Sequence, residues 1–167
     1  IRRQEILQYR PQLFYPLEQA ARSGNLKATI LLMDRSNLQI DASQNEDLAV
    51  VPILRAAVLS GELAAVELLF GRGVAVRSGA GLAVEAARSG NAEMLHLLIK
   101  RGAGVNEKDA EGQTALHIAA SANDEAMARA LLVHRADRSI RDKQGKTAAE
   151  VARASGHRAL ADLLAPP

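Results

Sequence analysis

Hydrophobic residues recur in this chain at helical spacing, in short segments separated by turns. Residues 109–137 show the pattern most clearly. Leu131 and Leu132 lie four and five residues after Met127, a spacing that places all three on one face of a helix. A shorter apolar segment, residues 116–120, precedes them and is rich in alanine. The pattern predicts a turn, a short helix, a tight corner, a second helix and a loop.

The polar residues of this segment fit the boundaries of those elements. Asp109 and Gly112 are typical turn residues. Thr114 is placed to cap the first helix, where its hydroxyl accepts a bond from an otherwise unpaired backbone N–H. Asn123 lies where the chain must reverse, and asparagine tolerates the left-handed conformation better than most residues.

The unit recurs at a fixed period. Asp109, Gly112 and Thr114 recur as Asp142, Gly145 and Thr147, and the separation is the same in all three pairs. Residues 20–25 recur letter for letter as residues 86–91, at twice that separation. A constant period in the range of about 20–50 residues indicates a stacked array of small structural units.

The repeat resembles the ankyrin repeat, and the resemblance covers about residues 15–164. The first part of the ankyrin pattern is matched by Asp109-x-x-Gly112-x-Thr114-Ala115-Leu116-His117-x-Ala119-Ala120, and the second part by residues 97–106. The resemblance implies an all-α solenoid of stacked helix-turn-helix units with short β-hairpin turns, called fingers. It also implies that the ring of His117 ties neighbouring turns together.

The repeats divide the chain into about five units. We expect residues 1–15 to form an N-terminal capping helix or linker and residues 16–165 to form the ankyrin-repeat domain. The repeat boundaries fall at about 15–48, 49–76, 77–108, 109–141 and 142–165. The second repeat is out of phase, which predicts a long acidic finger at Asp41–Asp47 followed by a stunted finger at Val74–Ala80.

Several positions depart from the ankyrin pattern. Repeat three has Gly81, Val84 and Glu85 where threonine, histidine and an apolar residue are usual. Repeat four has Arg135 in a glycine position, and repeat five has Glu150 in the histidine position. We expect any effect of these residues to be confined to the local cap and turn geometry and to leave the overall fold intact.

The amino-acid composition limits the classes of function that the chain can have. The chain is 48% hydrophobic but only 2% aromatic, which suits thin helices packed in layers. A net charge of +2 does not suggest a nucleic-acid binder, and the absence of cysteine excludes disulfides and thiolate metal sites. No apolar run approaches the roughly 20 residues that span a bilayer. The non-Met start predicts a fragment or processed form; the compartment is open, with a soluble cytoplasmic protein favoured.

The sequence carries no recognisable catalytic or cofactor site. None of the four histidines has another histidine or a carboxylate at metal-ligand spacing, so no metal is expected. No serine lies in a nucleophile elbow. The glycine-rich segments 71–73 and 79–81 fit no phosphate-binding loop. These absences predict a protein that is not an enzyme and uses no cofactor.

The basic residues suggest a binding surface. In ankyrin-type arrays the first helix of each repeat and its finger line a concave groove, and the positions after the paired alanines face it. The candidate partner-binding residues are Arg22, Ser23, Leu59, Arg88, Ser89, Lys108, Glu111, Gln113, Arg141, Lys143, Gln144 and Lys146. They are mostly positive, which predicts an acidic protein segment as the partner. The alternative is that they are ordinary solvated residues.

The sequence therefore favours a protein–protein interaction module, monomeric on its own, that binds a partner through the groove and the fingers. One alternative is the substrate-targeting domain of a larger enzyme, such as a secreted bacterial effector. Another is a nucleic-acid-binding groove, which the low net charge and the lack of stacking aromatics oppose.

Overall fold

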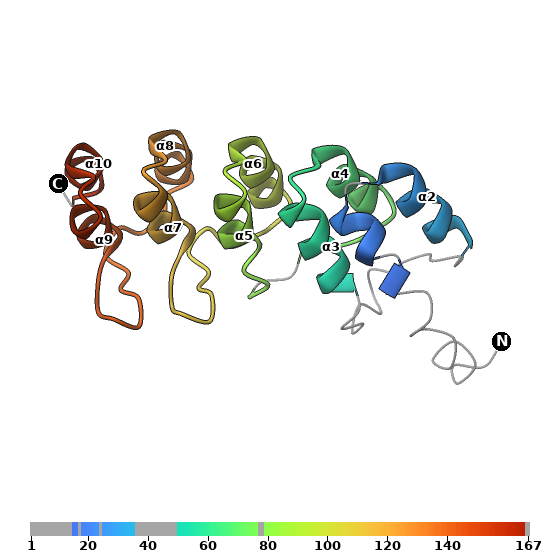
Figure 1. Ribbon diagram of the computed structural model, residues 1–167, viewed down its shortest axis with the longest axis horizontal. Coiled ribbons are helices and arrows are strands. Elements are labelled where there is room, and N and C mark those ends of the chain that lie inside the picture. The colour runs from blue at the N-terminus through green and yellow to red at the C-terminus, as the bar shows by residue number, and fades with distance from the viewer. Residues whose placement is uncertain (1–14, 17, 24, 36–49, 77–78, 166–167) are drawn as a thin grey trace. The chain divides into compact units, whose positions relative to one another are not determined.

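The computed structural model describes residues 15–16, 18–23, 25–35, 50–76 and 79–165 (Figure 1). The predicted N-terminal capping helix and the acidic finger at Asp41–Asp47 lie outside the described residues. Among the described residues, regular structure consists of helices and one isolated bridge between Arg141 and Thr147. The predicted all-α class is confirmed. The helices are residues 15–16 and 18–22, α2 (Leu26–Arg35), α3 (Val50–Leu59), α4 (Leu63–Gly71), α5 (Leu82–Arg88), α6 (Ala92–Lys100), α7 (Ala115–Ala122), α8 (Glu125–Val133), α9 (Ala148–Ala154) and α10 (Arg158–Leu164).

The chain forms two units, Ile1–Ala75 and Val76–Pro167. In the first unit, α3 contacts α4, and α4 also contacts α2. Leu54 and Leu69 are buried between α3 and α4 at 2% and 1% exposure, with Ala57 and Val66 fully covered beside them. Small side chains at these positions let the two short helices approach closely.

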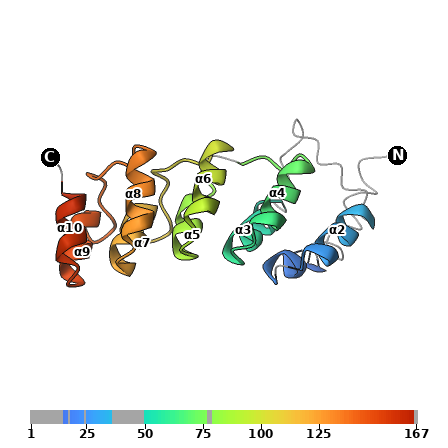
Figure 2. The same ribbon diagram turned by 90° about the horizontal axis from the view of Figure 1, so that it is seen from above.

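The second unit contains three helix pairs, α5–α6, α7–α8 and α9–α10, in chain order (Figure 2). The first helices contact one another in the order α5, α7, α9, and α6 contacts α8. The larger core side chains come mainly from the second helices, whereas the first helices contribute many buried alanines. The buried residues of these helices include Met94, Leu95, Leu98, Met127, Leu131, Ala83, Ala86, Ala115, Ala119 and Ala152. This division confirms the thin, layered core expected from the composition.

His117 joins two repeats through both ring nitrogens. The backbone N–H of Thr114 donates to His117 Nδ1 at 3.2 Å, and the Thr114 hydroxyl lies 2.8 Å from the same atom. Because Nδ1 accepts, the proton is on Nε2, which donates to the Lys146 carbonyl at 3.0 Å. His117 is only 1% exposed. The prediction that this ring ties neighbouring turns together is confirmed, and Thr114 is the N-cap of α7 as expected.

Glu150 preserves the helix cap in the place of that histidine. The backbone N–H of Thr147 donates to Glu150 Oε2 at 2.7 Å, and the Glu150 N–H donates to Thr147 Oγ1 at 3.3 Å. This is a complete capping box on α9. Glutamate in this position therefore keeps the helix cap, without a counterpart of the bond that His117 makes to the Lys146 carbonyl.

Glu107 stabilises the backbone that directly precedes α5. Its carboxylate accepts backbone N–H bonds from Gly79 and Gly81, both at 2.7 Å, and from Gly104 at 3.2 Å. Gly81 is the N-cap of α5 in a left-handed conformation, with φ of 67°. A Cβ on Gly104 would lie 2.8 Å from Glu107 Cγ, so glycine makes room for this side chain. A carboxylate from a following segment thus accepts the N–H of the N-cap residue of α5, as His117 Nδ1 accepts that of Thr114 in the next repeat.

Two helix corners place residues other than glycine in the left-handed region. Asn123 has φ of 56°, as predicted. Arg135 has φ of 62°, and its counterpart in the preceding repeat is Gly102, with φ of 102°. The turn geometry is therefore kept in repeat four, with an arginine in a conformation that costs an L-residue roughly 1–2 kcal/mol.

Replacing that arginine with glycine should stabilise the protein. Arg135→Gly is expected to raise the free energy of unfolding by about 0.5–1 kcal/mol, because the relief of backbone strain exceeds the entropy that glycine gains when unfolded. Urea unfolding measures the change. The reciprocal variant Gly102→Ala should lower stability by about 1 kcal/mol. Equal stability of Arg135→Gly and the wild type would contradict the strain assigned to this corner.

Candidate protein-binding surface

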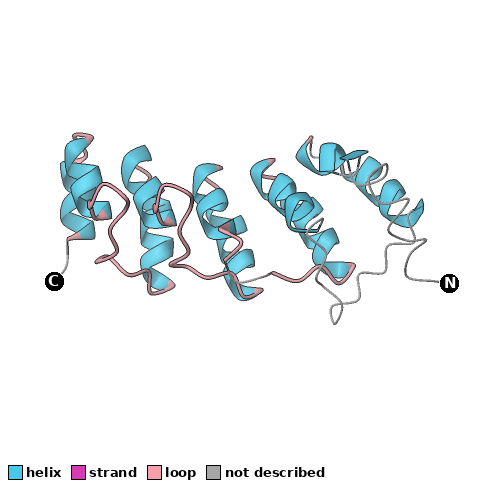
Figure 3. Ribbon diagram, turned by 90° about the horizontal axis from the view of Figure 1, so that it is seen from below, coloured by secondary structure: helices cyan, strands magenta, loops and turns pink. Residues whose placement is uncertain are grey.

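The predicted interface residues of the second unit lie on α5 and on two fingers. We call residues 105–113 the α7 finger and residues 138–146 the α9 finger, after the helices that follow them. Figure 3 shows both as loops on the same side of the helix pairs. The fingers are tight turns, and no extended strand occurs in the described part of the chain.

An aspartate closes each finger in the same way. Asp109 Oδ1 accepts the backbone N–H groups of Glu111 at 3.0 Å and Gln113 at 2.8 Å. Asp142 Oδ1 accepts those of Gln144 and Lys146, both at 2.9 Å. The bond from the Lys146 N–H lowers the pKa of Asp142 below its usual 3.8. Asp142 therefore remains charged at neutral pH. Through these bonds the two aspartates fix the backbone of both turns.

The two fingers are bonded to each other. The backbone N–H of Lys143 donates to the Glu111 carbonyl at 3.1 Å, and Lys108 Nζ donates to the Arg141 carbonyl at 3.1 Å. A Cβ on Gly112 would lie 3.0 Å from the Lys143 backbone nitrogen, so the close approach depends on glycine. Lys108, predicted to bind a partner, thus also links the fingers.

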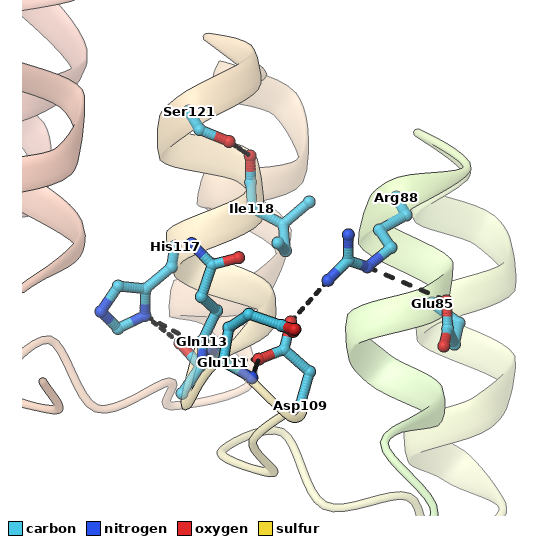
Figure 4. A network of polar contacts seen from close by, with 9 residues as sticks. Glu85, Arg88, Asp109, Glu111, Gln113, His117, Ile118 and Ser121 are labelled. Atoms are coloured by element: carbon cyan, nitrogen blue, oxygen red, sulfur yellow. Dashed lines mark hydrogen bonds and ion pairs between the residues drawn. The ribbon is translucent and has the colours of Figure 1, made fainter. Parts of the chain in front are cut away.

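Arg88 is paired within the chain. Its Nη2 lies 2.5 Å from Asp109 Oδ2, and its Nε lies 3.9 Å from a carboxylate oxygen of Glu85 (Figure 4). Ser121 occupies the equivalent position in the next repeat and donates instead to the Ile118 carbonyl at 2.9 Å. The Arg88 side chain is 42% exposed, but its charge is balanced by neighbouring carboxylates.

The charge of Arg141 is also balanced within its own repeat. Its Nη1 donates to Glu150 Oε2 at 2.9 Å and to the Gly145 carbonyl at 2.6 Å. Hydrogen bonds from Thr147, and to a smaller extent the charge of Arg141, lower the pKa of Glu150. The predicted positive surface is therefore weaker at Arg88 and Arg141 than the residue types alone indicate.

The α9 finger retains exposed cations. Lys143, Gln144 and Lys146 are all exposed, and neither lysine forms an ion pair with the residues that the structure describes. On the α7 finger, Glu111 is exposed and Gln113 is half-buried. These side chains extend from a backbone that the aspartate turns hold in place.

The serines of the predicted interface bond to their own helices. Ser89 Oγ donates to the Ala86 carbonyl at 2.9 Å, and Ser23 Oγ donates to the Ala20 carbonyl at 3.1 Å. Both residues are exposed. Their hydroxyls thus end helices, and they keep lone pairs that can accept a bond from a partner.

The remaining predicted residues belong to the first unit. Arg22 is exposed and lies 3.5 Å from a carboxylate oxygen of Glu18, one turn earlier. Leu59 ends α3 and is 41% exposed. Because the two units are described separately, the placement of these residues in one groove with the α9 finger stays a prediction.

Two of the four histidines lie close together in the fold. His96 Nδ1 lies 3.0 Å from His134 Nε2, although the residues are 38 positions apart. Sequence spacing did not show this pair because it forms between α6 and the end of α8, which contact each other in the fold. Among the described residues no group of three or more histidines or carboxylates is arranged to hold a metal.

Comparisons with known proteins agree with the fold. Residues 83–167 match the family described as ankyrin repeats, in three copies. Protein phosphatase 1 regulatory subunit 27 of Homo sapiens and that of Mus musculus are each 46% identical to this chain over 54 residues. The match covers 32% of this chain and 35% of each relative, so the chain spans about a third of their length. No helix in the described ranges has the length and apolar character needed to cross a bilayer.

Proposed function

This chain belongs to the ankyrin-repeat family, and from that premise we propose that it binds an acidic segment of a partner protein on the α7 and α9 fingers. The repeats make it a protein-interaction module. The surface proposed for the partner is the part of the ankyrin groove formed by the first helices and the fingers of the second unit. Arg22, Ser23 and Leu59 are proposed as further partner contacts on the first unit.

The observation that carries the proposal is the pair of exposed lysines on a fixed turn. Lys143 and Lys146 flank Gln144, and Asp142 holds the backbone of all three through bonds to the Gln144 and Lys146 N–H groups. Charges on a rigid turn attract an acidic segment without the entropy cost of ordering a loop. Such charges raise the association rate and orient the partner.

Neighbouring side chains would define the direction of the bound segment. Gln113 and Gln144 each carry an amide that can donate to and accept from a peptide backbone. Glu111 lies beside the lysines, since its carbonyl accepts the Lys143 N–H. Its negative charge would repel an acidic segment on that side, so one register would be favoured over the reverse.

Arg88, Lys108 and Arg141 have a positioning role in this proposal. Arg88 braces Asp109, Lys108 bonds the Arg141 carbonyl, and Arg141 bonds Glu150. Charge reversal at these positions would disturb the fingers as well as any partner contact. They are therefore poor sites for testing recognition alone.

The test compares two charge reversals of equal size. Protein is captured from a cell lysate by the purified chain, by a Lys143→Glu/Lys146→Glu variant and by a control variant, Lys100→Glu/Arg158→Glu. The control residues are exposed and lie on the second helices α6 and α10. We expect the finger variant to lose at least about tenfold in partner recovery, and the control to match the wild type, because the control residues lie on second helices, outside the proposed surface.

Recovery that falls equally in both variants would indicate general charge attraction, and unchanged recovery in the finger variant would remove the α9 finger from the interface. Either outcome contradicts the proposal. Repeating the capture at higher salt should weaken wild-type binding, because exposed charges are screened.

A second candidate comes from the relatives named protein phosphatase 1 regulatory subunit 27. We propose a phosphatase as one partner class for this chain. The test is gel filtration of the chain mixed with purified protein phosphatase 1. Co-elution that the Lys143→Glu/Lys146→Glu variant abolishes would support both the partner and the surface, whereas separate elution would exclude this partner.

A further inference from the structure

We propose that His96 and His134 form a binding site for a divalent transition-metal ion of the zinc or copper class. The two rings face each other across a repeat boundary, with His96 Nδ1 and His134 Nε2 3.0 Å apart. The ring centroids are 5.1 Å apart and the ring planes are tilted by 42°. The proposed partner-binding surface lies on the fingers and does not use either residue.

The nitrogen separation is close to that of two imidazoles on one metal ion. Bonds of about 2.0–2.1 Å place two ligand nitrogens about 2.9 Å apart in a square-planar site and about 3.3 Å apart in a tetrahedral one. The observed 3.0 Å lies within this range. A rotation of each ring about its Cβ–Cγ bond would direct both lone pairs to a common point.

The protons need little rearrangement. In the present contact one ring donates its N–H to the other, so one of the two facing nitrogens carries a proton. A metal ion replaces that shared proton, which moves to the far nitrogen of the same ring. Both rings then remain neutral, with His96 protonated on Nε2 and His134 on Nδ1. Binding should weaken in acid, because a protonated imidazole cannot ligate a metal.

The site is accessible and open. His96 is exposed and His134 is half-buried, so an ion can reach them from solvent. In the described part of the chain no further histidine or carboxylate joins the pair as a third ligand. Water or a side chain of another molecule would complete the coordination. Imidazole nitrogens favour zinc, copper or nickel over calcium and magnesium, which prefer oxygen ligands.

A bound ion would connect two repeats. His96 is in the middle of α6, and His134 is the C-cap residue of α8. These helices already contact each other. An ion held by one ring from each would add a coordinate link between repeats three and four. It would stabilise the folded chain by an amount that grows with the logarithm of the ion concentration above the dissociation constant.

The test uses the untagged full chain, because a histidine tag would itself bind metal. The thermal midpoint is measured with EDTA and with ZnCl₂. At zinc concentrations tenfold above the dissociation constant we expect a rise of about 3 °C or more. His96→Ala and His134→Ala should each abolish the rise. His157→Ala is the matched control and should keep it, because His157 lies at the start of α10.

A second measurement separates this site from binding elsewhere. In NMR spectra of the imidazole groups, zinc should shift the ring signals of His96 and His134 and leave His117 unchanged, because both His117 nitrogens are bonded within the core. A zinc-induced rise that survives in the His96→Ala/His134→Ala double variant would overturn the proposal. So would a wild-type chain that shows neither a shift in midpoint nor a change in these ring signals.

Discussion

Leu131→Ala should lower the free energy of unfolding by about 2–5 kcal/mol, since it removes a fully buried side chain and leaves a cavity. Leu131 is 0% exposed in α8, which packs against α7 and α6. A layered core of short helices has few large side chains per repeat, so the loss of one leucine affects both the helix pair and its stacking on the neighbouring repeat.

Urea unfolding of the wild type and the variant measures this effect. Val133→Ala is the control, because it truncates an aliphatic side chain of the same helix that is 80% exposed. The control should change stability by less than about 0.5 kcal/mol. If Leu131→Ala unfolds at the same urea concentration as the wild type, the packing assigned to α8 is wrong.

Glu107→Ala should cost about 2–3 kcal/mol, although Glu107 is not in a helix or in the hydrophobic core. Its carboxylate accepts three backbone N–H bonds, and two of them, from Gly79 and Gly81, fix the backbone at the start of α5. Hydrogen bonds to a charged group contribute about 1.5–3 kcal/mol, and Gly81 is buried, so its N–H would lose its partner without gaining water.

Two observations together test this role. Urea unfolding gives the loss of stability, and amide hydrogen exchange should speed up at Gly79 and Gly81. Glu107→Gln keeps the shape and one acceptor oxygen, so it should cost less than the alanine variant. Glu111→Ala, which removes an exposed carboxylate from the same finger, is the control and should leave both readouts unchanged. If the exchange rates at Gly79 and Gly81 are unchanged in Glu107→Ala, Glu107 does not protect these N–H groups and the role assigned to it is wrong.

The local elements of the fold could be predicted from the sequence because they depend on neighbouring residues. Thr114 caps α7, Asn123 adopts the left-handed conformation, and His117 bonds an adjacent turn. Each of these residues occupies a fixed position in the repeat. All three residues lie within residues 83–167, which match three ankyrin repeats, while the division of the whole chain into five repeats stays a prediction.

The contacts between repeats were harder to predict. Arg88 was expected to offer a positive charge, but Asp109, 21 residues later, lies against its guanidinium. Glu107 bonds glycines 26 and 28 residues before it, and His96 meets His134 across 38 residues. None of these spacings is a multiple of the repeat, because each contact joins different parts of adjacent units. Residue type alone did not show them.

In the two fingers, the residues that fix the backbone differ from those whose side chains extend into solvent. This difference is useful for protein engineering. Asp109 and Asp142 close the turns, and Gly112 allows the neighbouring finger to approach closely, because a Cβ there would lie only 3.0 Å from the Lys143 backbone nitrogen. A combinatorial library on this scaffold should keep these three residues and vary the side chains that extend from the turns. The positions to randomise are Glu111, Gln113, Lys143, Gln144 and Lys146. Such a library would sample new binding specificities while keeping the backbone conformation of the fingers.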